Sequence, residues 1–130
     1  MVLLDTHTLL WLFGDSENLT ARVVEAINTQ ERFISVVSLW EIAIKKGLAD
    51  PKRKLNIKMS ILEIAKECDR QGIGILPITP ADCNRVEGLP HLHEDPFDRI
   101  IISQAMERGL VLLTKDERIW QYDNVETLWY

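Results

Sequence analysis

Acidic residues stand just behind two short apolar segments that have the character of buried strands. Asp5 directly follows Val2–Leu4, and two residues separate Asp116 from Leu110–Leu113. If both segments belong to one parallel sheet, both acids lie at its carboxyl edge, which is where such sheets collect their ligands.

Three further acids accompany expected helices. Glu41 is the only charged residue in the apolar stretch Phe33–Ile44, where a helix is expected to leave the second strand. Asp95 and Asp98 open the expected helix Pro96–Arg108. All of these acids can face the same end of one sheet.

Such a set of carboxylates predicts a metal site. Carboxylates in one pocket repel one another, and some stay protonated unless a cation joins them. Mg²⁺ and Mn²⁺ take oxygen ligands from a few carboxylates together with phosphate and water. One or two such ions can activate water and stabilise the leaving oxygen in phosphodiester cleavage. Because the chain has no Gly-x-Gly-x-x-Gly or Walker motif, we favour a nuclease.

Each acid also has a structural explanation. Ser38 and Glu41 fit a capping box at the start of a helix. Asp95 stands before a proline, as a helix N-cap often does, and Asp5 and Asp116 could cap the helices behind them. Chance alone, however, does not send an acid to the functional end of every main element.

The elements that would position these acids alternate between apolar runs and helical patterns. The expected strands are Val2–Leu4, Phe33–Val36, Gly74–Ile78, Leu110–Leu113 and Val125–Leu128. The expected helices are Thr6–Phe13, Leu19–Thr29, Ser38–Lys46, Lys58–Gln71, Thr79–Val86, Pro96–Arg108 and Asp116–Gln121. Loops are expected at Ala49–Asn56 and Pro90–Glu94. Continuously apolar strands between helices indicate a parallel sheet covered on both faces.

Composition narrows the class of protein. A chain of 130 residues holds one domain, which we expect to span residues 1–130. A net charge of −5 argues against passive coating of nucleic acid, but not against an enzyme whose acids gather at a metal. Cys68 and Cys83 are well separated and suit a reducing compartment. With no signal peptide or membrane-spanning run in the sequence, we expect a cytoplasmic protein.

Four motifs together resemble PIN-domain proteins in order and spacing. They are Leu3–His7, Ser38–Ile42, His93–Ile101 and Leu112–Asp116. Within that family the chain is similar to the VapC-type toxins that carry a His-x-Asp-Pro-Phe-Asp-Arg signature. The resemblance runs nearly end to end, and Asp-Pro-Phe-Asp-Arg is its most specific element.

The resemblance implies a three-layer α/β/α PIN-like, Rossmann-like domain with a central parallel sheet. It implies an Mg²⁺- or Mn²⁺-dependent endoribonuclease that acts as the toxin of a toxin–antitoxin pair. The implied partners are an RNA substrate, a cognate antitoxin that holds the toxin inactive, and a second copy of the chain in a homodimer. No membrane partner is implied.

The resemblance also assigns roles to residues of this chain. The acids that match the family's catalytic metal ligands are Asp5, Glu41, Asp98 and Asp116. Asp95 matches an additional acid, which binds the metal or only caps the helix. Ser38 and Thr114 match small hydroxyl positions that support the acids.

Other polar residues near the motifs leave two explanations open. His93 contacts substrate phosphate or is a surface loop residue, and Arg99 neutralises phosphate or, as we prefer, pairs with a carboxylate. The basic stretch Lys45–Lys58 is an RNA-contacting edge or, more commonly for such runs, a solvated loop. The tryptophans are expected in the core or in dimer contacts rather than as base-stacking platforms.

Two other functions remain open. A haloacid-dehalogenase-like phosphatase also has a strand ending in Asp, but it needs a second Asp at the position held here by His7. A catalytically silent PIN-like module that only binds a partner would not require all four acids.

Overall fold

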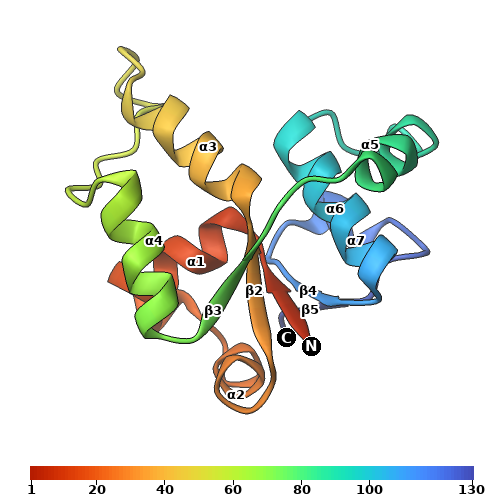
Figure 1. Ribbon diagram of the computed structural model, residues 1–130, viewed down its shortest axis with the longest axis horizontal. Helices are drawn as coiled ribbons and strands as arrows, with labels where there is room; N and C mark the ends of the chain where they lie inside the picture. Colours follow the sequence, from red (N-terminus) through yellow and green to blue (C-terminus); the bar gives the residue numbers. More distant parts are fainter.

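A computed structural model describes residues 1–130, and its sheet has five parallel strands in the order β3-β2-β1-β4-β5 (Figure 1). The strands are β1 (Val2–Leu4), β2 (Arg32–Ser35), β3 (Ile73–Leu76), β4 (Val111–Leu113) and β5 (Thr127–Leu128). In the centre of the sheet, Leu4 of β1 pairs with Ile34 of β2 and with Leu113 of β4. The carboxyl ends of the three central strands therefore lie side by side, next to Asp5.

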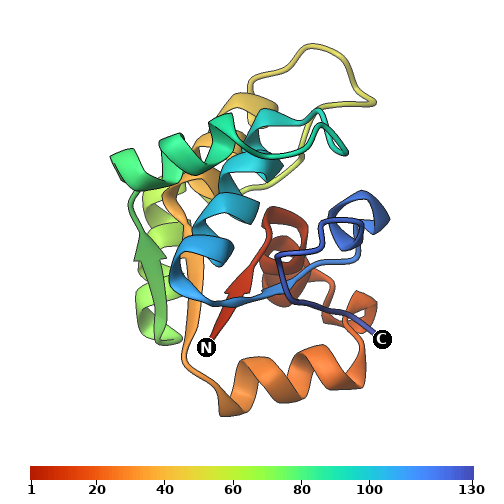
Figure 2. The same ribbon diagram turned by 90° about the vertical axis from the view of Figure 1, so that its right-hand side faces the viewer.

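Helices cover both faces of this sheet. They are α1 (Thr6–Gly14), α2 (Ala21–Thr29), α3 (Val36–Lys46), α4 (Ile61–Arg70), α5 (Pro80–Glu87), α6 (Pro96–Arg108) and α7 (Glu117–Trp120), with a 3₁₀ turn at Ser16–Asn18. Figure 1 shows α1 and α4 on one side of the strands and α5 and α6 on the other. In Figure 2, α2 lies beyond the amino ends of the strands, at the opposite end of the molecule from α3.

Two hydrophobic clusters hold the helices on the sheet. Because successive side chains of a strand point to opposite faces, Val2 and Leu4 belong to one cluster and Leu3 to the other. The first cluster includes residues of α1, α2 and α4, and the second includes residues of α6 and α7. All three residues of β1 are fully buried. The expected three-layer α/β/α fold with a central parallel sheet is thus confirmed.

The start of α3 differs from the prediction. Strand β2 ends at Ser35, whose hydroxyl accepts a hydrogen bond of 3.1 Å from the backbone N–H of Val37. The helix therefore begins at Val36, two residues earlier than predicted, and Ser38 lies inside it. The capping box proposed for Ser38 and Glu41 is wrong, because Ser35 already caps this helix.

Two other helices begin later than predicted because their caps stand further along the chain. Helix α2 follows Thr20, whose hydroxyl accepts from the helix backbone, rather than starting at Leu19. Helix α4 starts after a capping box of Ser60 and Glu63, three residues beyond the expected Lys58. No helix combines the length and the apolar character needed to cross a membrane. Both cysteines are free thiols, as expected.

Close packing between β2 and β3 leads to a first prediction. A Cβ at Gly74 would lie 2.7 Å from the ring of Phe33, its partner across the strands. We expect Gly74→Ala to lower the free energy of unfolding by about 1–3 kcal/mol, because the ring must shift out of its packed position. Gly14→Ala is the matched control, since a Cβ at the end of α1 would have no atom within 4 Å. Urea denaturation that gives both variants equal stability would contradict this packing.

Candidate active site

Asp5 combines a structural and an electrostatic role at the end of β1. Its Oδ1 accepts hydrogen bonds from the backbone N–H of Thr8 at 2.9 Å and from the Thr8 hydroxyl at 2.7 Å, so it caps α1 as one explanation expected. Burial raises the pKa of Asp5, and hydrogen bonds from the Thr114 and Thr8 side chains lower it only in part. A nearby positive charge would therefore stabilise the ionised form of the Asp5 carboxyl group.

Asp95 and Asp116 also cap helices. Oδ1 of Asp95 accepts from the backbone N–H groups of Phe97 at 2.8 Å and Asp98 at 3.3 Å, at the start of α6. Oδ1 of Asp116 accepts from the backbone N–H of Arg118 at 2.9 Å, at the start of α7. The structural explanation of these acids is right, and it does not exclude a second role for their charge.

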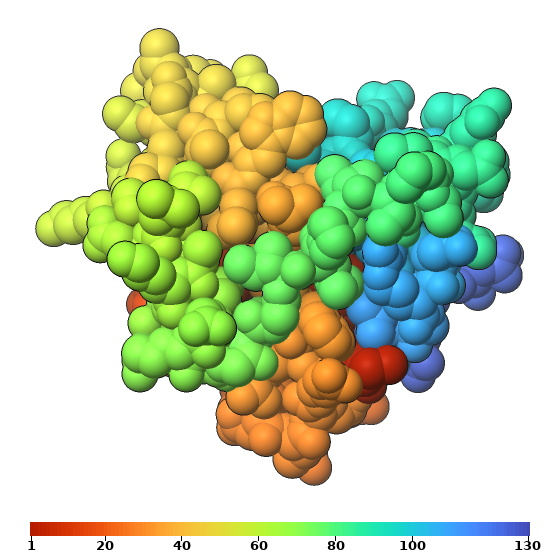
Figure 3. All heavy atoms as spheres, in the orientation of Figure 1, coloured from red at the N-terminus to blue at the C-terminus, as the bar shows by residue number.

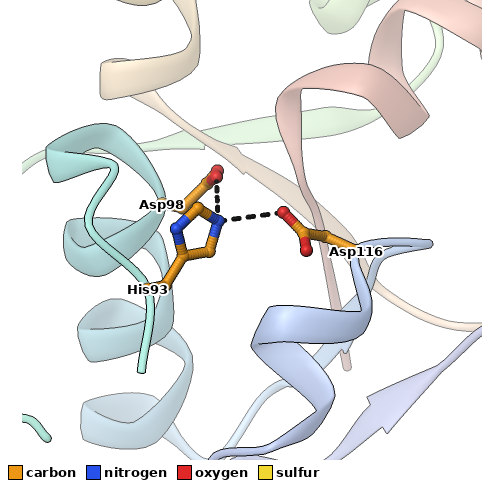
Figure 4. Close-up of side chains that lie close together, drawn as sticks. All are labelled: His93, Asp98 and Asp116. Atoms are coloured by element: carbon orange, nitrogen blue, oxygen red, sulfur yellow. Dashed lines mark hydrogen bonds and ion pairs between the residues drawn. The ribbon is translucent and has the colours of Figure 1, made fainter. Parts of the chain in front are cut away.

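Three side chains form the tightest group of possible metal ligands (Figure 4). Nε2 of His93 lies 2.9 Å from Oδ2 of Asp98 and 2.9 Å from Oδ2 of Asp116. One nitrogen or oxygen atom from each of the three residues lies within 4.8 Å of the others. The group thus joins three parts of the chain: the loop before α6 with His93, α6 itself with Asp98, and the turn before α7 with Asp116.

The other predicted acids surround Asp98 without belonging to this tight group. The pKa of Asp98 is raised to about 8, first by burial and then by the charges of Asp95, Glu41, Asp5 and Asp116. The other four acids singled out from the sequence are therefore close enough to influence the carboxyl group of the fifth, Asp98. They come from the ends of β1 and β4 and from α3 and α6, as a shared edge of the sheet requires.

Glu41 is buried and held by partners from two elements. The Thr6 hydroxyl lies 2.6 Å from its Oε1 and 2.9 Å from the Ser38 hydroxyl, and Lys45 Nζ lies 2.5 Å from its Oε2. Ser38 thus supports Glu41 through Thr6, a residue that sequence reasoning missed. Its place in the turn directly after Asp5 was the available signal. The spacing of Lys45, four residues after Glu41 in a helix, could have indicated their pairing.

Thr114 supports two acids at the end of β4. Its hydroxyl accepts from the backbone N–H of Asp116 at 3.1 Å, and its side chain helps to lower the pKa of Asp5. The side chain is fully buried. This position agrees with the supporting role expected for Thr114.

His93 and Arg99 lie where the sequence did not place them. His93 is 3% exposed, so the alternative of a surface loop residue is wrong. Arg99 is also buried, and it forms no salt bridge, which corrects the preferred prediction. Its guanidinium donates instead to the carbonyl groups of Val86, Leu89, Pro90 and His93 and to the hydroxyl of Tyr122. Arg99 therefore fixes the loop before α6.

A hollow of about 380 Å³ gives solvent access to two of the acids. It is lined by Asp5, His7, Trp11, Lys115, Asp116 and Glu117. Lys115 Nζ lies 5.9 Å from the centre of the Trp11 ring, and that ring packs at 5.6 Å against Trp129. The lining of this hollow therefore includes an aromatic ring and a positively charged side chain close to the acids.

The basic residues of the stretch Lys45–Lys58 fall into two groups, those that bind another part of the chain and those that are exposed. Lys45 is engaged with Glu41, and Lys46 Nζ donates to the carbonyl of Met59 at 2.5 Å. The remaining basic side chains, Lys52–Lys54 and Lys58, are exposed. They belong to the α3–α4 connection, whose first part stands out from the upper left of the molecule in Figure 3. Their exposure is compatible with both expected alternatives, an RNA-contacting edge and a solvated loop.

Comparisons with known proteins were made on sequence and on structure. The family model described as PIN domain matches residues 2–125. Ribonuclease VapC22 from Mycobacterium tuberculosis (strain ATCC 25618 / H37Rv) is 29% identical over 120 residues, covering 91% of this chain and 88% of that protein. DNA-bound VapBC from Salmonella typhimurium has a TM-score of 0.66 at 19% identity, with 98% of each chain covered. VapBC-1 from nontypeable Haemophilus influenzae has a TM-score of 0.67 at 17% identity, with coverage of 98% and 97%. At these identities the structural likenesses show the fold alone.

The raised pKa of Asp98 predicts a dependence of stability on pH. Between the ordinary pKa of 3.8 and the folded pKa of about 8, the unfolded chain has lost a proton that the folded protein keeps. Without metal, stability should therefore fall as pH rises through this interval. Asp98→Asn should remove much of this loss, melting near the wild type at pH 4 and above it at pH 8. Parallel melting curves in EDTA across this range would contradict the assigned repulsion.

Proposed function

Because the chain belongs to the PIN-domain family, we propose that it is a metal-dependent endoribonuclease and the toxin of a toxin–antitoxin pair. The observation that carries this proposal is the gathering of Asp95, Glu41, Asp5 and Asp116 around Asp98. The similarity to a ribonuclease over most of the chain supports the choice of RNA as substrate.

The residues present fit a divalent metal ion. Carboxylate oxygens are the ligands that Mg²⁺ and Mn²⁺ prefer. Burial and then the charges of its neighbours raise the pKa of Asp98 to about 8, which marks an arrangement that lacks positive charge. We propose Asp5, Glu41, Asp98 and Asp116 as the ligands, with Asp95 adding negative charge beside them. When bound, the metal supplies the charge that activates water and stabilises the leaving oxygen of a phosphodiester.

The remaining residues prepare this site by fixing the acids. Hydrogen bonds from Thr8 and Thr6 hold Asp5 and Glu41 in place. The positive ends of α1, α6 and α7 point at the cluster, because Asp5, Asp95 and Asp116 are their N-caps. In the proposed reaction Lys115, at the rim of the hollow, faces the approaching phosphate backbone.

The family match argues against one of the two alternative functions and leaves the other as a candidate. Membership of the PIN-domain family argues against a haloacid-dehalogenase-like phosphatase. A silent PIN-like module that only binds a partner stays the second candidate, and the cleavage experiment below separates it from an enzyme.

We also propose the organisation of the protein and its partners. Two hydrophobic clusters on one sheet and a family match over residues 2–125 support a single PIN domain spanning residues 1–130. The likeness to toxin–antitoxin structures supports a protein antitoxin as partner. The expected homodimer has a candidate face on α3, where Val36, Trp40 and Ile44 are exposed at helical spacing. Trp40 is 60% exposed and packs edge-on against Phe97, so it is not a core residue.

Removal of one acid should abolish cleavage. We expect Asp5→Asn to reduce the rate of RNA cleavage in Mg²⁺ or Mn²⁺ by about 100-fold or more, since it removes a charge on which the bound ion depends. The fold should be kept, with a melting temperature at least that of the wild type without metal, because Asn caps a helix as well as Asp does and one repelling charge is removed. EDTA should abolish cleavage by the wild type, and excess Mg²⁺ should restore it.

The matched control is Asp69→Asn, an exposed acid on α4 outside the cluster. Cleavage of total RNA by purified wild type, Asp5→Asn and Asp69→Asn is followed on gels under identical metal conditions. Equal activity of all three proteins would remove Asp5 from the site. No metal-dependent cleavage by the wild type on any RNA would favour the binding module.

The excess negative charge also predicts how an antitoxin inhibits. We expect an Arg or Lys of the antitoxin to approach Asp98 and its neighbours, because a cation relieves the same repulsion that a metal would relieve. The structure of the complex with the cognate antitoxin is the measurement. A complex in which no basic side chain reaches the acids would refute this mode of inhibition.

A further inference from the structure

We propose that His93 is a positioning residue whose Nε2–H donates a hydrogen bond to the carboxylate of Asp116 and lies beside the carboxyl group of Asp98, and that His93 is not itself a metal ligand. The proposal rests on the proposed function, because it describes how this chain prepares the acids of that site. His93 lies close enough to Asp98 and Asp116 to be either a third metal ligand or a hydrogen-bond donor that positions the acids. The proposal decides between these two roles.

The backbone around His93 determines which ring nitrogen carries the proton. The backbone N–H of Asp95 donates a hydrogen bond of 3.2 Å to Nδ1 of His93. An acceptor nitrogen needs its lone pair, so Nδ1 is unprotonated and the proton of the neutral ring is on Nε2. The opposite tautomer would place two N–H groups against each other at this distance.

The protonated nitrogen faces the acids. Nε2 lies 2.9 Å from Oδ2 of both Asp98 and Asp116, and the contact with Asp116 has hydrogen-bond geometry. Figure 4 shows the ring between the two carboxylates. Because Nε2 carries a proton, it has no lone pair for a metal. The ring instead links the carboxyl groups of Asp98 and Asp116, which come from separate elements of the fold.

The loop that carries His93 holds the ring in this position. The backbone N–H of His93 donates to the Tyr122 hydroxyl at 3.1 Å, and that hydroxyl donates to the carbonyl of Pro90 at 2.8 Å. Arg99 donates to the carbonyls of Pro90 at 2.9 Å and His93 at 3.3 Å. With both ring nitrogens engaged and the side chain buried, His93 has one orientation.

NMR of the imidazole nitrogens tests the tautomer directly. In ¹⁵N-labelled protein without metal, the His93 ring should show a protonated Nε2 and an unprotonated Nδ1. The same pattern should persist when the protein is saturated with Mg²⁺. A protonated Nδ1 in the free protein, or an Nε2 that loses its proton to coordinate Mg²⁺, would overturn the proposal.

Substitutions test whether the donor matters for the acids. The side-chain amide of His93→Gln can reach the place of Nε2, whereas that of His93→Asn ends near the place of Nδ1. We expect His93→Asn to weaken Mn²⁺ binding by about 10- to 100-fold, the usual effect of losing a group that orients metal ligands. His93→Gln should restore most of the affinity, and His91→Gln, at an exposed histidine two residues away, should leave it unchanged. Circular dichroism confirms that each variant is folded.

The readouts separate this proposal from the proposed function. Mn²⁺ affinity, measured by the electron paramagnetic resonance of the free ion, and the imidazole NMR need no RNA. Wild-type affinity in folded His93→Asn, or equal losses in folded His93→Asn and His93→Gln, would overturn the positioning role. Absence of any Mn²⁺ binding by the wild type would overturn it as well. Failure to cleave RNA with these readouts intact would count against the nuclease alone.

Discussion

Electrostatic repulsion among buried carboxyl groups is the constraint that the rest of this structure has to accommodate. Burial raises the pKa of Asp98, and the charges of four neighbouring acids raise it further. The fold tolerates this arrangement because most of the acids have partners of their own. Asp5, Asp95 and Asp116 each bind backbone N–H groups, and Glu41 is held by Thr6 and Lys45. Asp98 has no comparable backbone partner, so the unrelieved repulsion is concentrated on one carboxyl group.

The hydrophobic layers keep these charges together. The fully buried β1 lies between β2 and β4, and its side chains enter the clusters on both faces of the sheet. Asp5 thus extends from the most enclosed strand, whereas Asp98 and Asp116 come from elements packed on or beside that sheet. The cluster on one face fixes α1, and the cluster on the other fixes α6 and α7. Burial of apolar area therefore offsets the unfavourable approach of like charges.

Local signals made much of the fold predictable. Strand β1 and helix α6 have the predicted bounds, since Asp95 and Pro96 mark the start of α6 and Gly109, in a left-handed conformation, its end. The acids were predictable because parallel strands share a carboxyl edge. The contacts of Thr6 and Arg99 were not, because they depend on residues distant in the chain or on the path of a loop. Ser38 resembles a helix cap in the sequence, but Ser35 caps the helix because β2 ends there, and the sequence pattern did not place that strand end.

Three acids of the cluster double as helix caps, and this has a consequence for the gene. Asp5, Asp95 and Asp116 each use Oδ1 to cap a helix, and asparagine performs the same task with its side-chain oxygen. Aspartate and asparagine codons differ by a single base. One point mutation at any of these codons therefore removes a charge and leaves the helix start intact. Descendants that keep the helix caps while losing one charge of the acidic cluster are therefore within one evolutionary step of this sequence.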